Sequence, residues 1–398
     1  MINAFMKKIE YILKHNRFAQ QIYRCLFSMI FRFLGLFFRQ DSNMVLMQSF
    51  SGKRFNDSPR VLFERMLQRP DCESLHFVWA FNEPDLYKLP RTTVVRMDSW
   101  SYWKAALKSK YWITNVNIER GLSFKKKGTV YVMTGHGSGP KTGGNAAPSR
   151  SDYDFSNVDL ITADGEYIQE IFSRDFGARK EAIQLSGRPI CDALFSYKEL
   201  DNMRRKKIRN KICNELGIPK NKKIVLYAPT WRESDLLNNK SDFISHVNFK
   251  KWHQVLGDEY FILLRAHSIT AEVNGIRFSN WVKDCTEYPD INDLYVVADF
   301  LISDYSSVFT DYSILEKPML CYAYDYDEYC QKRGLYFDLR KHITTFSNED
   351  AMLHYLLEMN TEFEVQKSKE YLHFIAGYGG NATNCCIEKM LELGRIAS

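Results

Sequence analysis

The chain lacks paired cysteine motifs. Its nine cysteines are scattered over 398 residues and show neither C-x-x-C nor C-x-x-H spacing. The adjacent pair Cys385 and Cys386 is poorly placed to form a disulfide with itself. Structural zinc sites and disulfide frameworks use regular spacings. The pattern therefore argues against a structural zinc site and predicts folding in a reducing compartment.

The chain also lacks internal repeats, proline-rich tracts and long low-complexity linkers. Apolar residues make up 45% of it and charged residues 26%, which is typical of a globular protein. A chain of this length can form two domains with a sizeable core each. Because no linker separates the halves, we expect the two domains to lie against each other with a cleft between them.

Acidic residues are nearly absent from the first 40 positions. Seven basic residues and the single acid Glu10 give this segment a charge of +6, which equals the net charge of the whole chain. The rest of the chain is therefore formally neutral. A neutral body argues against a nucleic-acid-binding surface, which requires a basic face.

No apolar run in this basic segment reaches the ~20 residues needed to span a bilayer. Arg24 and Arg32 interrupt the longest stretch, and a small-residue cleavage site typical of a signal peptide is missing. Large apolar residues lie between the arginines. We predict that residues 1–42 form an amphipathic helical segment on the anionic cytoplasmic surface of a membrane. The alternative is a helix buried against the body or a partner.

From residue 43 onward, short β-like runs alternate with helix-like stretches. This order predicts an α/β fold with two Rossmann-like, doubly wound parallel-sheet domains, covering residues 43–200 and 201–398. The charged stretch Tyr197–Leu216 is expected to be a helix that bridges them. The expected strands are 45–49, 75–81, 93–97, 111–114, 129–134, 160–163, 223–228, 260–265, 299–303 and 319–323, with helices at 59–68 and 101–109.

Ser306 and Ser307 follow one of these strands and precede a segment of helical spacing. Free backbone N–H groups, the helix dipole and two hydroxyls can converge on an anion at such a position. The sequence therefore predicts a phosphate site there. The alternative is an ordinary serine N-cap, and Asp311 one turn later is typical of an acid that stabilises its own helix.

Three other strand ends carry similar groups, and ligands of parallel sheets bind beyond the carboxyl ends of the strands. Arg232 and Arg265 provide cations that can clamp phosphate oxygens, and His267 follows closely. His136 lies in the glycine-rich loop 134–144, where an ordinary histidine pKa near ~6.5 suits a general base. Taken singly, each position also fits a solvated loop residue.

Several segments, in order from Val45 to Leu391, together resemble the CDP-glycerol glycerophosphotransferases, which make teichoic acids and related bacterial capsule polymers. They are Ser49-Phe50-Ser51-Gly52-Lys53 with Asn56 to Pro59, Tyr227-Ala228-Pro229-Thr230-Trp231-Arg232, Leu263-Leu264-Arg265-Ala266-His267, Asp290-Ile291-Asn292-Asp293-Leu294-Tyr295, Ser303-Asp304-Tyr305-Ser306-Ser307-Val308, Lys317-Pro318-Met319 and Arg333-Gly334-Leu335-Tyr336-Phe337-Asp338.

The resemblance implies a GT-B-type fold, peripheral attachment to the bacterial cell membrane, and transfer of a polyol phosphate from CDP-glycerol or CDP-ribitol to a lipid-linked or polymer acceptor. No cofactor or metal is implied. We assign His136 and His267 to catalysis, with the acceptor on the first domain and the donor on the second. The donor-binding residues would be Thr230, Arg232, Arg265, Asp290, Ile291, Asn292, Ser306, Ser307 and Asp311, and the acceptor-binding residues Ser51, Lys53, Gly137 and Lys141.

One segment departs from the family pattern. The usual loop reads Trp-His-Gly-Thr-Pro-Leu-Lys, whereas this chain has Gly135-His136-Gly137-Ser138-Gly139-Pro140-Lys141. The segment Gly187-Arg188-Pro189-Ile190-Cys191-Asp192 also matches the family's Gly-Tyr-Pro-Arg-Asn-Asp only loosely. These changes bear on acceptor identity more than on the chemistry.

Other functions remain open at this point. A nucleotide-sugar glycosyltransferase would share the architecture, and the Asp-x-Asp spacings at 152–154 and 325–327 occur in metal-dependent sugar transferases, although both also fit solvated turns. An inactive membrane-bound scaffold is a further alternative. The sequence does not distinguish glycerol from ribitol phosphate or a primase from a polymerase, and it predicts no oligomeric state.

Overall fold

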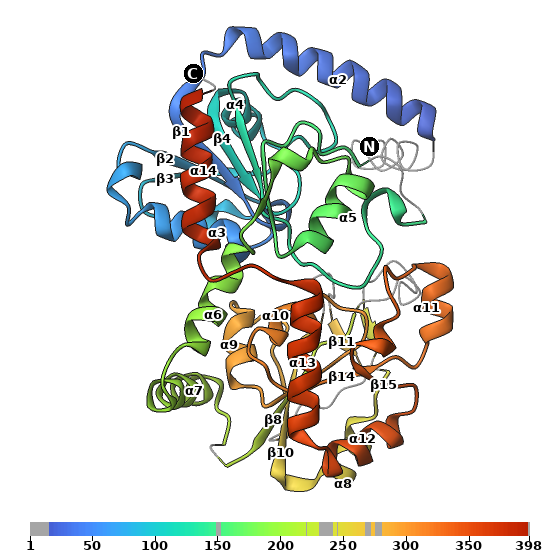
Figure 1. The fold of residues 1–398 in the computed structure, drawn as a ribbon. Coiled ribbons are helices and arrows are strands. Elements are labelled where there is room, and N and C mark those ends of the chain that lie inside the picture. The colour runs from blue at the N-terminus through green and yellow to red at the C-terminus, as the bar shows by residue number, and fades with distance from the viewer. Residues whose placement is uncertain are drawn as a thin grey trace.

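The computed structural model describes residues 16–148, 153–219, 221–230, 242–244, 246–266, 272–274 and 281–396. Within these ranges the chain forms two parallel β-sheets, each covered by helices, in two domains placed end to end (Figure 1). This confirms the predicted α/β fold with two parallel-sheet domains. All nine cysteines are free thiols.

The first sheet has seven strands in the order β3-β2-β1-β4-β5-β6-β7, and every neighbouring pair is parallel. Most of these strands consist of buried apolar residues, as expected for a sheet covered on both faces. Their bounds are β1 Asp41–Gln48, β2 His76–Phe81, β3 Thr92–Arg96, β4 Ser109–Thr114, β5 Val130–Met133, β6 Leu160–Ala163 and β7 Ile183–Leu185.

Alternate residues of these strands enter different cores, because successive side chains point to opposite faces. Leu46 packs in a core with α4 (Trp100–Lys108) and α5 (Glu166–Phe176), whereas Val45 and Met47 pack in another with α3 (Asp57–Met66). The first sheet is therefore a central layer between two helical layers.

The second sheet has six parallel strands in the order β12-β10-β8-β13-β14-β15. A separate pair, β9 (Asp242–Ile244) and β11 (Glu272–Asn274), is also parallel. The six strands are β8 Lys223–Tyr227, β10 Tyr260–Leu264, β12 Val282–Asp284, β13 Phe300–Ser303, β14 Met319–Tyr322 and β15 Thr344–Phe346. Its helices are α8 Phe249–Leu256, α9 Ile291–Val297, α10 Val308–Ser313, α11 Tyr326–Lys332, α12 Glu349–Glu358 and α13 Thr361–Ile375.

The charged stretch between the sheets forms two helices, α6 (Asp192–Lys198) and α7 (Asn202–Leu216). The single bridging helix predicted over 197–216 is therefore wrong at its start. Asp201 provides the physical reason, because its side chain caps α7 by accepting a hydrogen bond from the backbone N–H of Arg204.

The last helix, α14 (Ala382–Ile396), returns from the second domain to the first sheet (Figure 1). Its residues Cys386, Ile387 and Met390 are buried in the core that also contains α3. The carboxylate of Asp192 accepts hydrogen bonds from the backbone N–H groups of Ala382 and Thr383 at its start. Helix α14 thus belongs spatially to the first domain, although it follows the second in sequence.

Helix α2 (Arg17–Phe37) lies across the end of the first domain that faces away from the second (Figure 1). Phe31 packs against Trp103 and Phe124, so one side of the helix is attached to the body. The other side is exposed and largely apolar. Its exposed large apolar residues are Phe18, Ile22, Tyr23, Leu26, Met29, Ile30, Phe33, Leu36 and Phe37, and Gln21, Cys25 and Arg32 are exposed as well. Among the described helices, none has both the length and the apolarity to cross a bilayer.

Candidate active site

A cavity of about 1120 Å³ lies between the two domains, at the carboxyl ends of strands from both sheets. Its lining includes most of the residues predicted for the site: Lys53, His136, Gly137, Lys141, Thr230, Arg265, Asp290, Ile291, Ser306, Ser307 and Asp311. Ser51 and Asn292 do not line it. The predicted site residues Arg232 and His267 lie outside the described residues.

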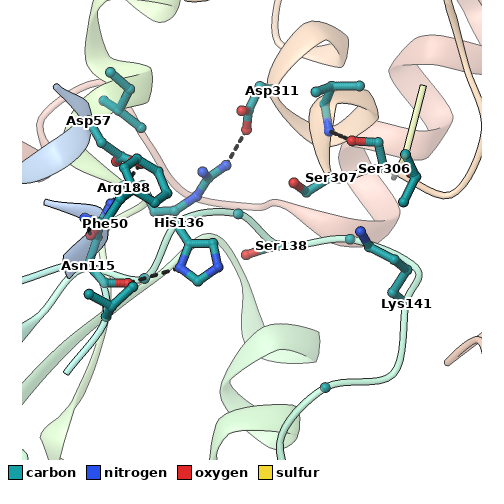
Figure 2. A pocket seen from close by; sticks show the side chains of 18 of the residues that line it. Phe50, Asp57, Asn115, His136, Ser138, Lys141, Arg188, Ser306, Ser307 and Asp311 are labelled. Atoms are coloured by element: carbon teal, nitrogen blue, oxygen red, sulfur yellow. Dashed lines mark hydrogen bonds and ion pairs between the residues drawn. The ribbon is translucent and has the colours of Figure 1, made fainter. Parts of the chain in front are cut away.

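His136 is held in one orientation by the backbone of the neighbouring strand end. Its Nδ1 atom lies 2.9 Å from the carbonyl oxygen of Asn115 (Figure 2). A carbonyl can only accept a hydrogen bond, so Nδ1 carries a proton and, in the neutral imidazole, Nε2 carries the lone pair. The ring of Phe50 packs edge-on against the imidazole, with the centroids 5.7 Å apart. The exposed imidazole therefore offers a proton acceptor at Nε2.

Asn115 itself is buried and fixed from two sides. Its side-chain oxygen accepts a hydrogen bond from the backbone N–H of Phe50 at 2.8 Å, and its side-chain nitrogen donates to Asp57 at 3.1 Å. The sequence prediction did not identify Asn115 as a site residue. The available signal was its place directly after the predicted strand 111–114.

The glycines beside His136 let the second domain approach the loop. A Cβ atom at Gly137, where φ is +142°, would lie 2.3 Å from the side-chain oxygen of Ser307. A Cβ atom at Gly139 would lie 2.9 Å from the Cα atom of Ser307. We expected these glycines to admit a substrate, but in the structure Ser307 occupies the space that the missing side chains leave.

The rest of the loop is also attached to the second domain. The backbone N–H of Tyr336 donates to the carbonyl oxygen of Pro140 at 2.7 Å, and that of Thr142 donates to Gly334 at 3.2 Å. Lys141 and Leu335 form an antiparallel bridge. The loop that carries His136 therefore begins in the first domain and is anchored on the second.

Ser306 and Ser307 precede α10, as predicted, and Ser307 is its N-cap residue. The side chain of Ser307 makes no capping hydrogen bond, whereas Ser306 accepts a long one, 3.4 Å, from the backbone N–H of Val308. An ordinary side-chain cap by Ser307 is therefore not observed. Both hydroxyl-bearing residues line the cavity (Figure 2).

The remaining donor-side residues line the cavity but also support the fold. Arg265 donates to the carbonyl oxygens of Cys285 and Tyr288, and burial lowers its pKa. The backbone N–H of Thr230 donates to Asp304 at 2.8 Å. Because Arg265 already bonds two carbonyl groups, part of its hydrogen-bonding capacity is committed before any ligand binds.

The predicted donor-binding residues 290–292 form the start of α9. The Asp290 side chain caps this helix by accepting a hydrogen bond from the backbone N–H of Asn292 at 3.0 Å. The side-chain nitrogen of Asn292 donates to the carbonyl oxygen of Ile190 at 2.7 Å. Asp290 and Ile291 thus face the cavity, while Asn292 holds the second domain against the first.

Arg188 also lines the cavity, although the sequence did not predict it as a site residue. It is 3% exposed and forms ion pairs with Asp164 and with Asp311. Figure 2 shows the pair with Asp311. Burial alone would lower the pKa of Arg188, but the two carboxylates raise it well above its ordinary value. Asp311 therefore faces an arginine of the other domain, and burial raises the pKa of its carboxyl group.

Of the two Asp-x-Asp segments, Asp152 lies outside the described residues. Asp325 accepts a hydrogen bond from the hydroxyl of Tyr305 at 2.9 Å. Within the described ranges, no group of three or more histidine, cysteine, aspartate or glutamate side chains is arranged to hold a metal ion.

Comparison with known proteins gives a consistent set of similarities. A sequence model of the family described as CDP-glycerol:poly(glycerophosphate) glycerophosphotransferase matches residues 28–376. A teichoic acid poly(glycerol phosphate) polymerase of Bacillus spizizenii is 31% identical over 354 residues, covering 84% of this chain and 86% of that protein. A teichoic acid glycerol-phosphate transferase of Staphylococcus aureus is 30% identical, covering 80% and 85%.

A solved structure of the wall teichoic acid polymerase TagF superimposes with a TM-score of 0.78 at 24% identity, covering 100% of this chain and 99% of that one. This similarity supports the same two-domain fold.

Proposed function

Because the chain belongs to the CDP-glycerol:poly(glycerophosphate) glycerophosphotransferase family, we propose how its cleft transfers glycerol phosphate from CDP-glycerol in teichoic acid synthesis. The enzyme is a transferase of the class that moves substituted phosphate groups. The acceptor is the hydroxyl of a lipid-linked or polymeric molecule, and CMP is the leaving group.

The observation that supports this mechanism is the hydrogen bond between Nδ1 of His136 and Asn115. It leaves Nε2 free to take the proton of the acceptor hydroxyl as that oxygen attacks the phosphorus bearing glycerol. A new P–O bond forms, the bond to the bridging oxygen breaks, and CMP departs with that oxygen. Lys53, Gly137 and Lys141, which line the same cavity, are the proposed acceptor contacts.

The donor is held on the second domain. Ser306, Ser307 and Thr230 provide hydroxyl and backbone groups, and Arg265 provides positive charge beside them. Arg232 and His267 are the proposed pyrophosphate ligands. Neutralising the charge on departing CMP is the largest task in such a transfer. We propose that protein groups perform it, so that neither a metal nor another cofactor is required.

Two parallel-sheet domains that meet at one cleft fit the GT-B arrangement, with the acceptor on the first domain and CDP-glycerol on the second. The exposed apolar side of α2 fits a peripheral position on the cytoplasmic face of the bacterial membrane. Both assignments agree with a lipid-linked acceptor that reaches the cleft from the side of the first domain.

The test is CMP release from CDP-glycerol in the presence of a lipid-linked or polymer acceptor. We expect wild type to release CMP, and His136→Ala to lower kcat by about 10²- to 10⁴-fold, the usual effect of losing a general base. His354→Ala is the matched control, because His354 is exposed on α12 and should leave the rate unchanged. Equal rates for wild type and His136→Ala would remove His136 from the mechanism.

The same assay separates the alternatives. Replacing CDP-glycerol by CDP-ribitol tests which donor the enzyme uses. Adding EDTA at about 5 mM tests whether the reaction needs a metal ion. We expect CDP-glycerol to be preferred and EDTA to have no effect. No CMP from either donor with wild type would contradict the proposed reaction, and full loss in EDTA would contradict the absence of a metal.

A further inference from the structure

We infer that Arg188 and Ser138 are positioning residues that hold the His136 loop in register with the donor domain. The inference rests on the proposed function of the cleft. Neither residue would touch the reacting atoms. Instead, together with Asp164, Asp311 and Thr310, they form a closed ring of hydrogen bonds that passes through both domains.

The first half of the ring is an ion-pair bridge. The Nε atom of Arg188 lies 2.8 Å from a carboxylate oxygen of Asp164, which follows β6 in the first domain. Another guanidinium nitrogen pairs with Asp311 of α10 in the second domain. The three side chains are 4%, 5% and 14% exposed. Charges this deeply buried cannot exchange their partners for water, so the bridge tolerates little displacement of one domain against the other.

The second half of the ring passes through the catalytic loop. The hydroxyl of Ser138 donates to Asp164 at 2.6 Å, on the same oxygen that Arg188 contacts. The hydroxyl of Thr310 donates to the backbone carbonyl oxygen of Ser138 at 2.6 Å. Thr310 and Asp311 are neighbours in α10, so the two halves meet. Ser138, two residues after His136, is thereby fixed to both domains at once.

This arrangement bears on catalysis because the reaction joins groups from opposite sides of the cleft. His136 belongs to the first domain and the CDP-linked phosphorus is expected on the second, so their alignment depends on how the domains are docked. A misplacement of about 1 Å in such a transfer can cost about 10²-fold in rate. The ring sets that docking within a few residues of His136.

Contact between the domains also gives a physical reason for one change in the loop. Where the family pattern has threonine and proline after the glycine, this chain has Ser138 and Gly139. Ser138 retains a hydroxyl, and this hydroxyl reaches Asp164. Gly139, in place of the proline, allows the loop to lie against the backbone of Ser307.

The experiment compares Ser138→Ala, Arg188→Lys and Arg188→Gln with wild type in the full chain. We expect Ser138→Ala to lower kcat by about tenfold and Arg188→Gln by about 10²-fold. KM for CDP-glycerol should stay within about twofold, because neither Ser138 nor Arg188 is itself a proposed donor contact. Arg188→Lys should recover only part of the rate, since one ammonium cannot reproduce the two directed contacts of the guanidinium.

Two further measurements distinguish positioning from a purely structural role. Amide hydrogen exchange in 136–144 should become faster in Ser138→Ala and Arg188→Gln, while the core strands stay protected. Arg209→Gln is the matched control, because Arg209 pairs with Asp299 away from the cavity. It should change neither the loop exchange nor kcat per folded molecule.

The outcomes separate this inference from the proposed function. If wild type releases no CMP from CDP-glycerol, the proposed function fails. If wild type is active and Ser138→Ala and Arg188→Lys keep wild-type kcat and loop exchange, the positioning role is overturned. It is also overturned if the rate lost by these variants equals the fraction of protein that is unfolded. Should Arg188→Gln fail to fold, Ser138→Ala alone decides, because it removes a single hydroxyl.

Discussion

At the scale of single residues, the site depends on glycines, which have no side chain, as much as on its polar side chains. Gly137 and Gly139 bring the His136 loop against Ser307, a contact that any larger residue would prevent. Asn115 orients the imidazole through its backbone carbonyl, so its side chain acts only by holding that carbonyl in place. Each feature determines where His136 stands relative to the second domain.

Gly137→Ala tests this dependence. The new Cβ would lie 2.3 Å from the Ser307 hydroxyl oxygen, so the loop or α10 must shift, and we expect kcat to fall by about 10²-fold. Gly217→Ala is the control, because Gly217 also has a positive φ, +67°, but nothing lies within 4 Å of its added Cβ. The control should cost about 1–2 kcal/mol of stability, the strain of an L-residue in the left-handed region, and leave kcat unchanged.

Removing the obstructing side chain extends the Gly137 test. In Gly137→Ala combined with Ser307→Gly, both contacts to the Ser307 side chain disappear. The double variant should therefore lose less activity than the two single variants together. Strict additivity would show that the contact with Ser307 does not limit the reaction.

At the scale of secondary structure, most of the fold could be predicted because buried strands of a parallel sheet are continuous apolar runs. The ten expected strands are all present, with ends shifted by a few residues. The five missed strands, β7, β9, β11, β12 and β15, are three residues each, which is too short for a periodic signal. The break between α6 and α7 was missed because α7 is highly charged and carries little pattern of its own.

The site was predictable only where chemistry follows directly on a strand. His136, Ser306 and Arg265 were predicted in this way, and all three line the cavity. Arg188 was not, because its partners Asp164 and Asp311 lie 24 and 123 positions away in the sequence. A single sequence contains no local sign of such a contact.

Helix α9 provides a test at the same scale, because its carboxyl end depends on a buried lysine. The ammonium of Lys317 donates to the carbonyl oxygens of Tyr295, Val296 and Ala298, and burial lowers its pKa to about 8. The unfolded chain keeps the ordinary value near ~10.4. Between these two values the unfolded state binds more protons, so this group's contribution to stability rises with pH.

The prediction compares wild type with Lys317→Met by urea unfolding. The difference in free energy of unfolding should increase in favour of wild type by about 2 kcal/mol from pH 8 to pH 10. The buried tyrosines titrate alike in both proteins and cancel in the difference. Lys211→Met, at an exposed position on α7, should give a difference that is flat with pH. A flat difference for Lys317→Met would show that its pKa is not lowered.

At the scale of the whole molecule, α2 lies at the end of the first domain that faces away from the second (Figure 1), whereas the cleft lies between the two domains. The apolar side of α2 faces away from the second domain, so membrane contact there would leave the donor domain in the aqueous phase. A water-soluble nucleotide donor could then enter from one side while a lipid-linked acceptor arrives from the other. This geometry suits the two substrates proposed for the cleft.

Vesicle sedimentation with the full chain tests that orientation. The substitutions Phe33→Glu and Leu36→Glu together should weaken binding to vesicles containing phosphatidylglycerol by at least about tenfold, because two exposed apolar contacts are lost. Met203→Glu is the control, since Met203 is exposed on α7 of the linking segment and should bind like wild type. Unchanged binding by the α2 variant would place the membrane contact elsewhere.

The return of α14 to the first domain has a mechanical consequence. The chain passes between the domains twice, before α7 and again between α13 and α14, and the two passages touch. The backbone N–H of Tyr378 donates to Asp164, and a Cβ at Gly187 would lie 2.7 Å from Gly379. Two crossings that pack against each other at one place resist twisting and sliding of one domain against the other. They would therefore keep His136 and the donor site in one fixed alignment.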